Sequence, residues 1–192
     1  MIVSQNFIIN ENYLPSNICD DIINAAQAQK EIEGVIQGGT DKKIRNSRVV
    51  WLNEQWIYDW INGVINEINI EHKWNFTISH PEQIQFTKYN EGQFYGWHQD
   101  IYENIPADGF QRKISAVIPL VESNAYEGGD LEFYDPMTNP NKKQEDKIIR
   151  NEKLRQKGSI IVFPSYIYHQ VTPVLKGERL SIVIWFCGEK WK

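Results

Sequence analysis

The spacing of apolar residues changes near Phe76, and this change constrains the fold more than any other feature of the chain. Before it, apolar residues recur at helical spacing in two stretches, one that begins at Ser16 or Asn17 as a cap and ends near Ala26, and one over residues 54–69. After it the period becomes two, and Pro and Gly separate short segments, which is typical of antiparallel β structure. The sequence therefore predicts a mainly β fold with N-terminal helices packed outside it.

Seven strands are expected after residue 76. They cover residues 83–89, 94–99, 114–120, 131–134, 159–163, 168–174 and 179–186. Alternation in the first of them places Gln85, Thr87 and Tyr89 on one polar face, and alternation in the last places Arg179 and Trp185 on a shared face. A polar face of this kind is natural for the lining of a wet pocket, so we expect a pocket inside the β structure.

The length and composition of the chain fit one folded domain. It has 192 residues, of which 41% are hydrophobic and 23% are charged. We expect a single domain over residues 1–192, in which residues 1–75 give helical support and residues 76–192 form the β core. Residues 136–157, rich in Asn, Lys and Glu, are expected to be a surface insertion or a lid, and residues 34–46 a polar connection or a cover for the active site.

Charge, hydropathy and cysteine content exclude several classes of partner. A formal net charge of -5 works against attraction to a polyanion, so no nucleic-acid partner is expected. No apolar run approaches the roughly 18 residues needed to cross a bilayer and no leader pattern is visible, so we expect a cytoplasmic protein without a membrane partner. Cys19 and Cys187 lack metal-binding spacing and are expected to be reduced, small apolar residues. The oligomeric state is left open.

An imidazole and a carboxylate, those of His98 and Asp100, lie two residues apart in an expected strand. On an extended chain they point to the same face about 6.6 Å apart along the backbone, so both can reach one ion. His169 supplies the third ligand, and two histidines with one carboxylate form the set that holds non-haem Fe(II) with three positions open. Arg179 offers a charged fork suited to a carboxylate of a dicarboxylic acid such as 2-oxoglutarate. The four residues predict an iron-dependent oxygenase.

The same residues belong to a longer series of motifs. In chain order the series is Phe86-Thr87-Lys88-Tyr89, Gly92, Tyr95-Gly96-Trp97-His98-Gln99-Asp100, Arg112, Ser115, Tyr126-Glu127-Gly128-Gly129-Asp130-Leu131, Gly158, Phe163-Pro164-Ser165, His169-Gln170-Val171-Thr172-Pro173-Val174, Gly177, Arg179, Ser181 and Trp185. It resembles the Fe(II)/2-oxoglutarate dioxygenases of the prolyl 4-hydroxylase alpha-subunit-like class, and is most similar to their bacterial PKHD-type hydroxylase branch. The resemblance covers roughly residues 83–186, over half of the chain.

This resemblance implies a double-stranded β-helix core, of the jelly-roll or cupin-like kind, and roles for individual residues. It implies that His98, Asp100 and His169 are the metal ligands and that Arg179 pairs with the C5 carboxylate of 2-oxoglutarate. The remaining expected contacts are Tyr89, Trp185 and Ser181 for the cosubstrate, and Tyr95, Trp97, Arg112 and Gln85 for the substrate. Gly128 and Gly129 are expected to form a turn with positive φ and are given no chemistry.

The implied reaction is hydroxylation of a C–H bond, coupled to decarboxylation of 2-oxoglutarate to succinate and CO2. Fe(II) is the expected metal, 2-oxoglutarate and O2 are the expected cosubstrates, and ascorbate is a further expected ligand. A prolyl residue of a peptide or protein is the preferred substrate, with a free amino acid or another small metabolite as the alternative. Collagen-type members of the class have Lys at the position of Arg179, which argues against that narrower group.

Two other classes of function use the same residues. A zinc-dependent hydrolase or a cupin-like isomerase would use His98, Asp100 and His169 and keep one open position, but nothing in that chemistry requires Arg179. A binding protein that keeps the jelly roll without turnover would need neither the metal ligands nor the arginine. Release of labelled CO2 from 2-oxoglutarate under O2 distinguishes the three hypotheses.

Overall fold

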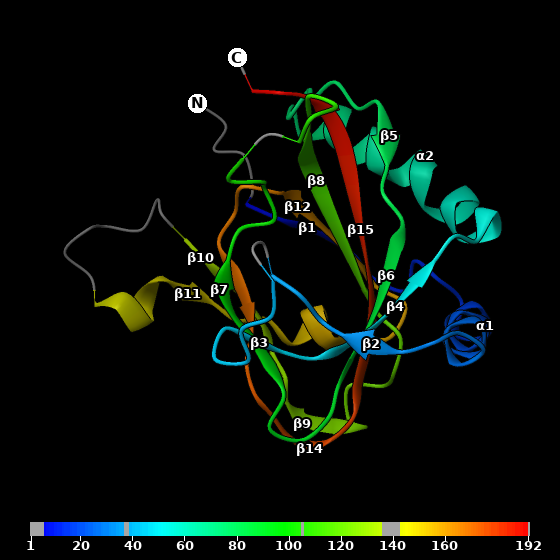
Figure 1. Ribbon diagram of the computed structural model, residues 1–192, viewed down its shortest axis with the longest axis vertical. Coiled ribbons are helices and arrows are strands. Elements are labelled where there is room, and N and C mark those ends of the chain that lie inside the picture. The colour runs from blue at the N-terminus through cyan, green and yellow to red at the C-terminus, as the bar shows by residue number, and fades with distance from the viewer. Residues whose placement is uncertain (1–5, 37–38, 105, 136–142, 192) are drawn as a thin grey trace.

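Two antiparallel sheets and two helices form most of the computed structural model, which describes residues 6–36, 39–104, 106–135 and 143–191 (Figure 1). The larger sheet contains, in spatial order, β1 (Ile8–Asn10), β12 (Ile160–Pro164), β8 (Phe110–Pro119), β15 (Arg179–Glu189), β6 (Ile84–Tyr89), β4 (Arg48–Leu52) and β2 (Ile32–Glu33), with β5 (His80–Pro81) also paired to β15. The smaller sheet contains β11 (Ile148–Ile149), β10 (Leu131–Tyr134), β13 (His169–Val171), β7 (Phe94–His98) and β3 (Arg45–Asn46). A separate pair is formed by β14 (Val174–Gly177) and β9 (Tyr126–Gly128).

The helices α1 (Ser16–Gln27) and α2 (Gln55–Glu71) lie against the larger sheet, on the side that faces away from the smaller sheet (Figure 1). One apolar cluster fills the space between the helices and the larger sheet and includes Ile61 of α2 and Ile118 of β8. A second cluster lies between the two sheets and includes Phe133 of β10 and Phe163 of β12. The expected jelly-roll fold, with helices packed outside a β core, is confirmed.

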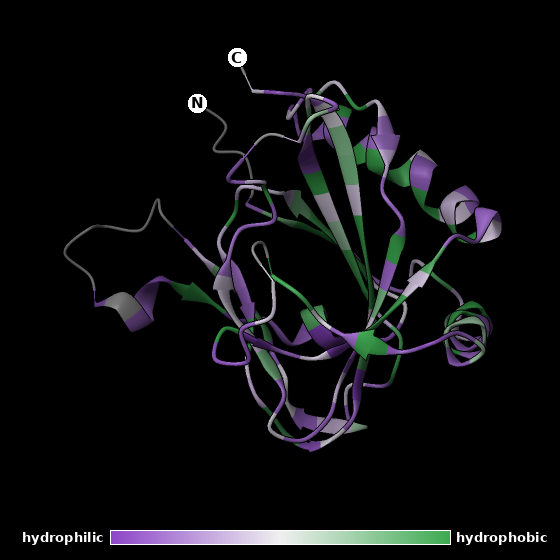
Figure 2. Ribbon diagram, in the orientation of Figure 1, coloured by the Kyte–Doolittle hydropathy of each residue, from purple (hydrophilic) through white to green (hydrophobic). Residues whose placement is uncertain are grey.

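The strand β15 contributes to both sides of the larger sheet because its side chains alternate. Leu180, Ile182, Ile184 and Phe186 belong to the cluster beneath the helices. Arg179, Ser181, Val183 and Trp185 line a cavity on the opposite face, between the sheets. Hydrophobic and hydrophilic bands likewise follow one another along β8 (Figure 2). The predicted alternation in β15 is therefore correct, and it separates the side chains of the core from those of the pocket.

The N-terminal part of the chain is less helical than the sequence suggests. Six of the seven expected strands form, and the seventh, over residues 168–174, is broken into β13 and the start of β14, which belong to different sheets. Residues before 76 add four more strands, since β1 pairs with β12, β2 with β4, β4 with β6 and β3 with β7. The expected side-chain cap of the first helix is wrong: Pro15 occupies the cap position and no side chain accepts a hydrogen bond there. The helix is stabilised instead by burial of Cys19, Ile22 and Ala26.

The structure describes part of the expected insertion over residues 136–157. Residues 136–142 lie outside the described part of the chain. Beyond them, η1 (Gln144–Lys147), β11 and η2 (Glu152–Arg155) follow, and β11 pairs with β10. Leu154 is buried, and the guanidinium of Arg155 donates hydrogen bonds to the carbonyl oxygens of Gly128 and Tyr126. Most of this segment is therefore part of the folded body.

The two glycines before β10 adopt the expected turn. Gly128 and Gly129 have φ values of 67° and 62°. A Cβ on Gly128 would lie 2.4 Å from the carbonyl oxygen of Pro173, and one on Gly129 would lie 3.2 Å from Cδ of Arg179. The turn therefore needs glycine both for its backbone conformation and for the close approach of its neighbours.

Cys19 and Cys187 are both free and buried, as expected. Burial raises the pKa of the Cys19 thiol to about 11. Among the described residues, no helix combines the length and the apolar character that crossing a membrane requires.

Candidate active site

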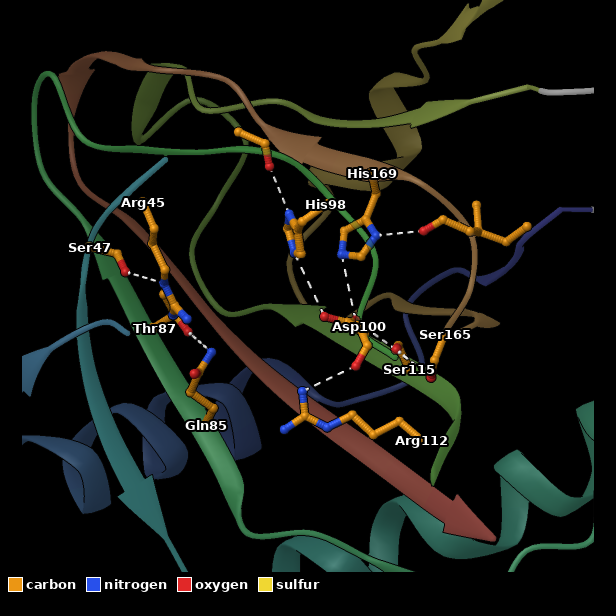
Figure 3. A network of polar contacts seen from close by, with 12 residues as sticks. Arg45, Ser47, Gln85, Thr87, His98, Asp100, Arg112, Ser115, Ser165 and His169 are labelled. Atoms are coloured by element: carbon orange, nitrogen blue, oxygen red, sulfur yellow. Dashed lines mark hydrogen bonds and ion pairs between the residues drawn. The ribbon is translucent and has the colours of Figure 1, made fainter. Parts of the chain in front are cut away.

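Three side chains, two from the smaller sheet and one from just beyond the end of β7, converge between the two sheets. His98 and His169 face each other because β7 and β13 pair in a register that aligns these two residues. Asp100 lies two residues beyond the end of β7, where its backbone N–H donates a hydrogen bond to the carbonyl oxygen of Ser165. One ligand atom from each of His98, Asp100 and His169 lies within 4.8 Å of the other two. Figure 3 shows both imidazoles pointing toward the carboxylate.

Backbone hydrogen bonds orient both imidazoles. Nδ1 of His98 lies 2.7 Å from the carbonyl oxygen of Gly96, and Nδ1 of His169 lies 2.9 Å from that of Ile167. A carbonyl oxygen only accepts, so each Nδ1 carries the proton and each Nε2 presents a lone pair. Burial, together with the neighbouring His169, lowers the pKa of His98 to about 3, so its ring is neutral near pH 7. The His98 ring is thus in the form that binds a metal ion.

The Asp100 carboxylate is buried and faces both histidines. Oδ1 lies 3.7 Å from Nε2 of His98, and Oδ2 lies 3.6 Å from Nε2 of His169. Although burial opposes ionisation, the charges of His169, His98 and Arg112 and a hydrogen bond from Ser115 hold the pKa of Asp100 below its usual value. The carboxylate is therefore ionised at neutral pH and is available as a ligand.

The spacing of the three side chains fits a metal ion. Ligand atoms bound at about 2.1 Å to one ion at angles of roughly 90° to 110° lie about 3.0 to 3.5 Å apart. One ligand atom from each of the three residues lies within 4.8 Å of the other two, so side-chain shifts on the order of 1 Å bring the set into this range. Two neutral imidazoles and one carboxylate form a donor set suited to Fe(II), although zinc sites accept the same donors.

Two cavities meet at this cluster. The inner cavity lies between the sheets and has a volume of about 40 Å³, and the outer cavity has a volume of about 580 Å³. Five residues line both: Gln85, Tyr95, His98, Asp100 and Trp185. Two of the three clustered side chains therefore stand where the cavities join, and the third, His169, belongs to the inner cavity.

Arg179 is the cationic residue of the inner cavity. It is 2% exposed, and its Nη1 donates a 2.9 Å hydrogen bond to Oγ of Ser181. The guanidinium carbon lies 5.5 Å from the ring centre of Tyr89, which also lines this cavity. Among the described residues, no carboxylate forms an ion pair with Arg179. The expected cosubstrate residues Tyr89, Arg179, Ser181 and Trp185 thus share one cavity, and its buried positive charge suits an anion.

The four residues expected at the substrate all line the outer cavity, but their surroundings differ. The ring of Tyr95 stacks on that of His98, with 3.5 Å between centres, and burial raises the pKa of Tyr95 to about 12. Trp97 is 36% exposed at the rim. Gln85 donates a 2.9 Å hydrogen bond to Oγ1 of Thr87. Tyr95 and Trp97 are therefore partly exposed aromatic residues beside the cluster, whereas Gln85 is only 5% exposed.

Arg112, the fourth expected substrate residue, is already paired. Its Nε and Nη2 donate to the two carboxylate oxygens of Glu82 at 2.8 and 2.6 Å, and its guanidinium carbon lies 3.6 Å from the ring centre of Trp185. Burial would lower the pKa of Arg112, but the hydrogen bonds and charge of Glu82 raise it overall. The carboxylate of Glu82 balances the charge of Arg112, and the guanidinium of Arg112 packs against the ring of Trp185 in the lining of the cavity.

Part of the segment over residues 34–46, expected as a polar connection or a cover for the active site, lies beside the outer cavity, although the sequence singled out none of its residues. Val35, Ile36, Ile44 and Arg45 line the outer cavity. Arg45 is 6% exposed; its Nε donates to Oγ of Ser47 and its Nη1 to the carbonyl oxygen of Val35, both at 2.8 Å. The cross-strand pairing of Arg45 with Tyr95 links this wall to the metal-ligating strand. The available signal was one of several basic residues in a polar segment, two positions before a serine, which is too common to single out.

A likeness to solved structures supports the architecture. The chain superimposes with a TM-score of 0.73 on a prolyl hydroxylase from Trichoplax adhaerens in complex with a hypoxia inducible factor oxygen degradation domain peptide fragment. The match covers 94% of this chain and 83% of that one at 20% sequence identity, so it shows a shared fold.

Sequence comparisons place the chain more closely. It is 38% identical over 101 residues to a PKHD-type hydroxylase of Shewanella oneidensis, covering 52% of this chain and 40% of that protein. It is 30% identical over 158 residues to a PKHD-type hydroxylase of Nitrosomonas europaea, covering 78% and 64%. The matched region thus spans less than two thirds of either relative. The model of the 2OG-Fe(II) oxygenase superfamily matches residues 84–187, more than half of the chain and the region that holds the clustered ligands and Arg179. This chain belongs to the 2OG-Fe(II) oxygenase superfamily.

Proposed function

We propose that this protein is an Fe(II)- and 2-oxoglutarate-dependent hydroxylase that acts on a C–H bond of a peptide or protein, with a prolyl residue as the preferred target. One observation carries the proposal: His98, Asp100 and His169 converge where a small cavity meets a larger, open one, and the small cavity holds a buried arginine that forms no ion pair with the described residues. A metal at this junction would contact a cosubstrate on one side and a substrate on the other.

The metal would be held by Nε2 of His98, Nε2 of His169 and a carboxylate oxygen of Asp100. The backbone hydrogen bonds at Nδ1 fix the direction of both rings before any ion arrives, which lowers the conformational entropy lost on binding. Fe(II), when bound with 2-oxoglutarate and O2, supplies oxidising chemistry that amino-acid side chains lack. The side chains of this protein provide position, charge and exclusion of water.

The inner cavity would hold 2-oxoglutarate through Arg179. The guanidinium is buried, is fixed by Ser181 and lacks an ion-pair partner among the described residues, so it offers its remaining N–H groups to the C5 carboxylate. Tyr89 lines the same cavity, and burial raises the pKa of its hydroxyl, which stays protonated and able to donate. The apolar side chains of Val117, Leu131 and Val171 keep water from the rest of the cosubstrate.

The rim of the outer cavity favours a polymeric substrate over a small metabolite. Five large side chains of this cavity are also among the exposed large hydrophobics of the surface: Val35 at 49%, Ile44 at 41%, Trp51 at 37%, Trp97 at 36% and Tyr168 at 49%. A grouped apolar rim is typical of a surface that contacts another chain. A free amino acid would fill the centre of the cavity and leave this rim uncovered, and it remains the alternative substrate class.

Release of CO2 tests the chemistry. With Fe(II), O2 and [1-14C]2-oxoglutarate, the purified protein should release labelled CO2, and a His169→Ala variant should not. A zinc hydrolase or a binding protein would release none, and that result would reject the proposal. The same assay with and without ascorbate tests whether this reductant is needed.

Identification of the substrate needs a second assay. The protein is offered a peptide library and, separately, a metabolite extract, and products are searched by mass spectrometry for a gain of one oxygen atom. Oxygen gain in a peptide supports the preferred substrate class. Gain only in a small molecule would replace it with the alternative.

A further inference from the structure

The carboxylate of Asp100 accepts a hydrogen bond from one serine, and that serine is hydrogen-bonded to a second one. Oγ of Ser115 donates a 2.7 Å hydrogen bond to Oδ2 of Asp100, and Oγ of Ser165 lies 3.0 Å from Oγ of Ser115 (Figure 3). Ser115 and Ser165 are both fully buried. Neither residue is a metal ligand, and neither lines the inner or the outer cavity. Their hydroxyls therefore act on the site only through Asp100.

The direction of these hydrogen bonds follows because each serine hydroxyl has only one proton to donate. The ionised carboxylate of Asp100 only accepts, so the single hydroxyl proton of Ser115 points to Oδ2. Because that proton is committed, Oγ of Ser115 must accept the hydroxyl proton of Ser165. The chain of donors runs from Ser165 through Ser115 to Asp100, and each bond polarises the next.

The backbone anchors both serines to the larger sheet. Ser115 stands in the middle of β8, where it pairs with Phe163 of β12 on one side and with Trp185 of β15 on the other. Ser165 follows β12, and its N–H donates a 2.9 Å hydrogen bond to the carbonyl oxygen of Lys113. The carbonyl of Ser165 also accepts from the N–H of Asp100. Asp100, which lies beyond the end of its own strand, is thus fixed by residues of the opposite sheet.

We propose that Ser115 is a positioning residue that anchors Oδ2 of Asp100, so that the carboxylate presents Oδ1 to the metal, and that Ser165 fixes the direction of the Ser115 hydroxyl. Each oxygen lies near one histidine, Oδ1 at 3.7 Å from His98 and Oδ2 at 3.6 Å from His169, but Oδ2 accepts the hydrogen bond of Ser115 and Oδ1 receives none from the described residues. This assignment rests on the proposed metal site and adds to it a specific oxygen and the residues that select it. It also identifies the larger sheet as a direct contributor to metal affinity.

Metal affinity is the direct test, measured with Mn(II) as an oxygen-stable probe by the electron paramagnetic resonance signal of the free ion. Ser115→Ala should raise the Kd for Mn(II) by about 10- to 100-fold, the range typical for loss of a hydrogen bond to a metal ligand. Ser165→Ala should have a smaller effect in the same direction, because Ser115 can still donate to Asp100. Ser115→Thr, which keeps the hydroxyl, should bind more tightly than Ser115→Ala.

Two control variants separate positioning from general loss of packing. Ser159→Ala also removes a buried serine hydroxyl, but that hydroxyl has no hydrogen-bond partner among the described residues and lies away from Asp100, so affinity should not change. Ile118→Val creates a cavity in the same strand on the helix side of the sheet, so it should lower the Tm without changing the Kd.

The outcomes distinguish this inference from the proposed function. If the wild-type protein binds Mn(II) and Ser115→Ala binds it equally well, the positioning role is wrong and the metal site stands. An equal loss of affinity in Ile118→Val would also overturn the role, since it would assign the effect to packing. If the wild-type protein binds neither Mn(II) nor Fe(II), both proposals fail.

Discussion

The inner and outer cavities meet at the same metal-ligating cluster but are built differently. Every residue that lines only the inner cavity belongs to a strand, and the examples Tyr89, His169 and Arg179 are at most 5% exposed. The outer cavity is walled largely by loops and strand ends, with side chains such as Val35 and Tyr168 that are 49% exposed. The sheets thus fix the cavity proposed for the cosubstrate, and the loops form much of the cavity proposed for the substrate.

The largest effect is expected at the junction of the two cavities. Asp100→Ala removes the only carboxylate of the metal-ligating cluster and should reduce bound Fe(II) to background in an anaerobic titration, because two neutral imidazoles bind the ion weakly. Asp21→Ala, an exposed carboxylate on α1, is the matched control and should bind Fe(II) normally. Full occupancy in the Asp100 variant would remove this residue from the ligand set.

The next effect is confined to the inner cavity. Arg179→Ala should raise the KM for 2-oxoglutarate by roughly 10- to 150-fold, equivalent to about 1.5 to 3 kcal/mol for a charge-assisted contact, with little change in metal affinity. Arg179→Lys keeps the charge without the planar fork and should lie between the two. An unchanged KM in the alanine variant would show that the cosubstrate is bound elsewhere.

A smaller effect is expected at the rim of the outer cavity. Trp51→Ala should weaken binding of the peptide found in the mass-spectrometric screen by about 5- to 30-fold, since a truncated interface aromatic costs about 1 to 2 kcal/mol. The KM for 2-oxoglutarate should not change. Trp60→Ala on α2 is the matched control, because Trp60 has a similar exposure of 39% and does not line either cavity. Equal loss in both variants would contradict a specific role for the rim.

The smallest effect concerns the stability of the outer wall. Glu82 accepts hydrogen bonds from Arg112, Tyr102 and Cys187, and although burial opposes ionisation, these contacts lower its pKa. Glu82→Gln should lower the free energy of unfolding at pH 7 by about 1 to 2 kcal/mol. The Glu82 pKa is depressed in the folded state, so its stabilisation is present above the unfolded pKa of about 4.3 and is lost as pH falls through the folded value.

Urea denaturation at several pH values measures this linkage. The difference between wild type and Glu82→Gln should be full at pH 7 and should shrink on acidification below about pH 4. Glu71→Gln, an exposed residue at the end of α2, should change stability by no more than about 0.5 kcal/mol at either pH. A difference for Glu82→Gln that is independent of pH would assign its effect to shape and not to charge.

The same contrast explains how much the sequence could predict. Six of the seven strands expected after Phe76 and the polar face of Arg179 follow from a period of two, because alternation alone decides which side chains face the pocket. The convergence of His98 with His169 also depends on the register of β7 and β13, which a single sequence does not give. Here the motif series indicated that His98 and His169 lie together, which periodicity alone does not.

The outer cavity could not be predicted in this way. Arg45 and Ile44 reach this cavity because β3 pairs with β7. The strand β3 has only two residues, so it leaves no periodic pattern in the sequence. The role of Ser115 was hidden for a different reason. A serine in a buried strand is usually a neutral filler, and its contact with Asp100 depends on the distance between two sheets. Both cases involve contacts between segments far apart in the sequence.

Because the side chains of β15 alternate between two faces, the effect of a substitution in this strand depends on whether the residue number is even or odd. Substitutions at even positions from Leu180 to Phe186 disturb the layer beneath the helices and should reduce the amount of protein that accumulates in cells. Substitutions at odd positions from Arg179 to Trp185 alter the surface offered to small molecules and should leave abundance nearly intact while changing turnover. Natural drift or directed evolution can therefore change ligand preference through the odd positions of this strand, while the even positions preserve the ability to fold.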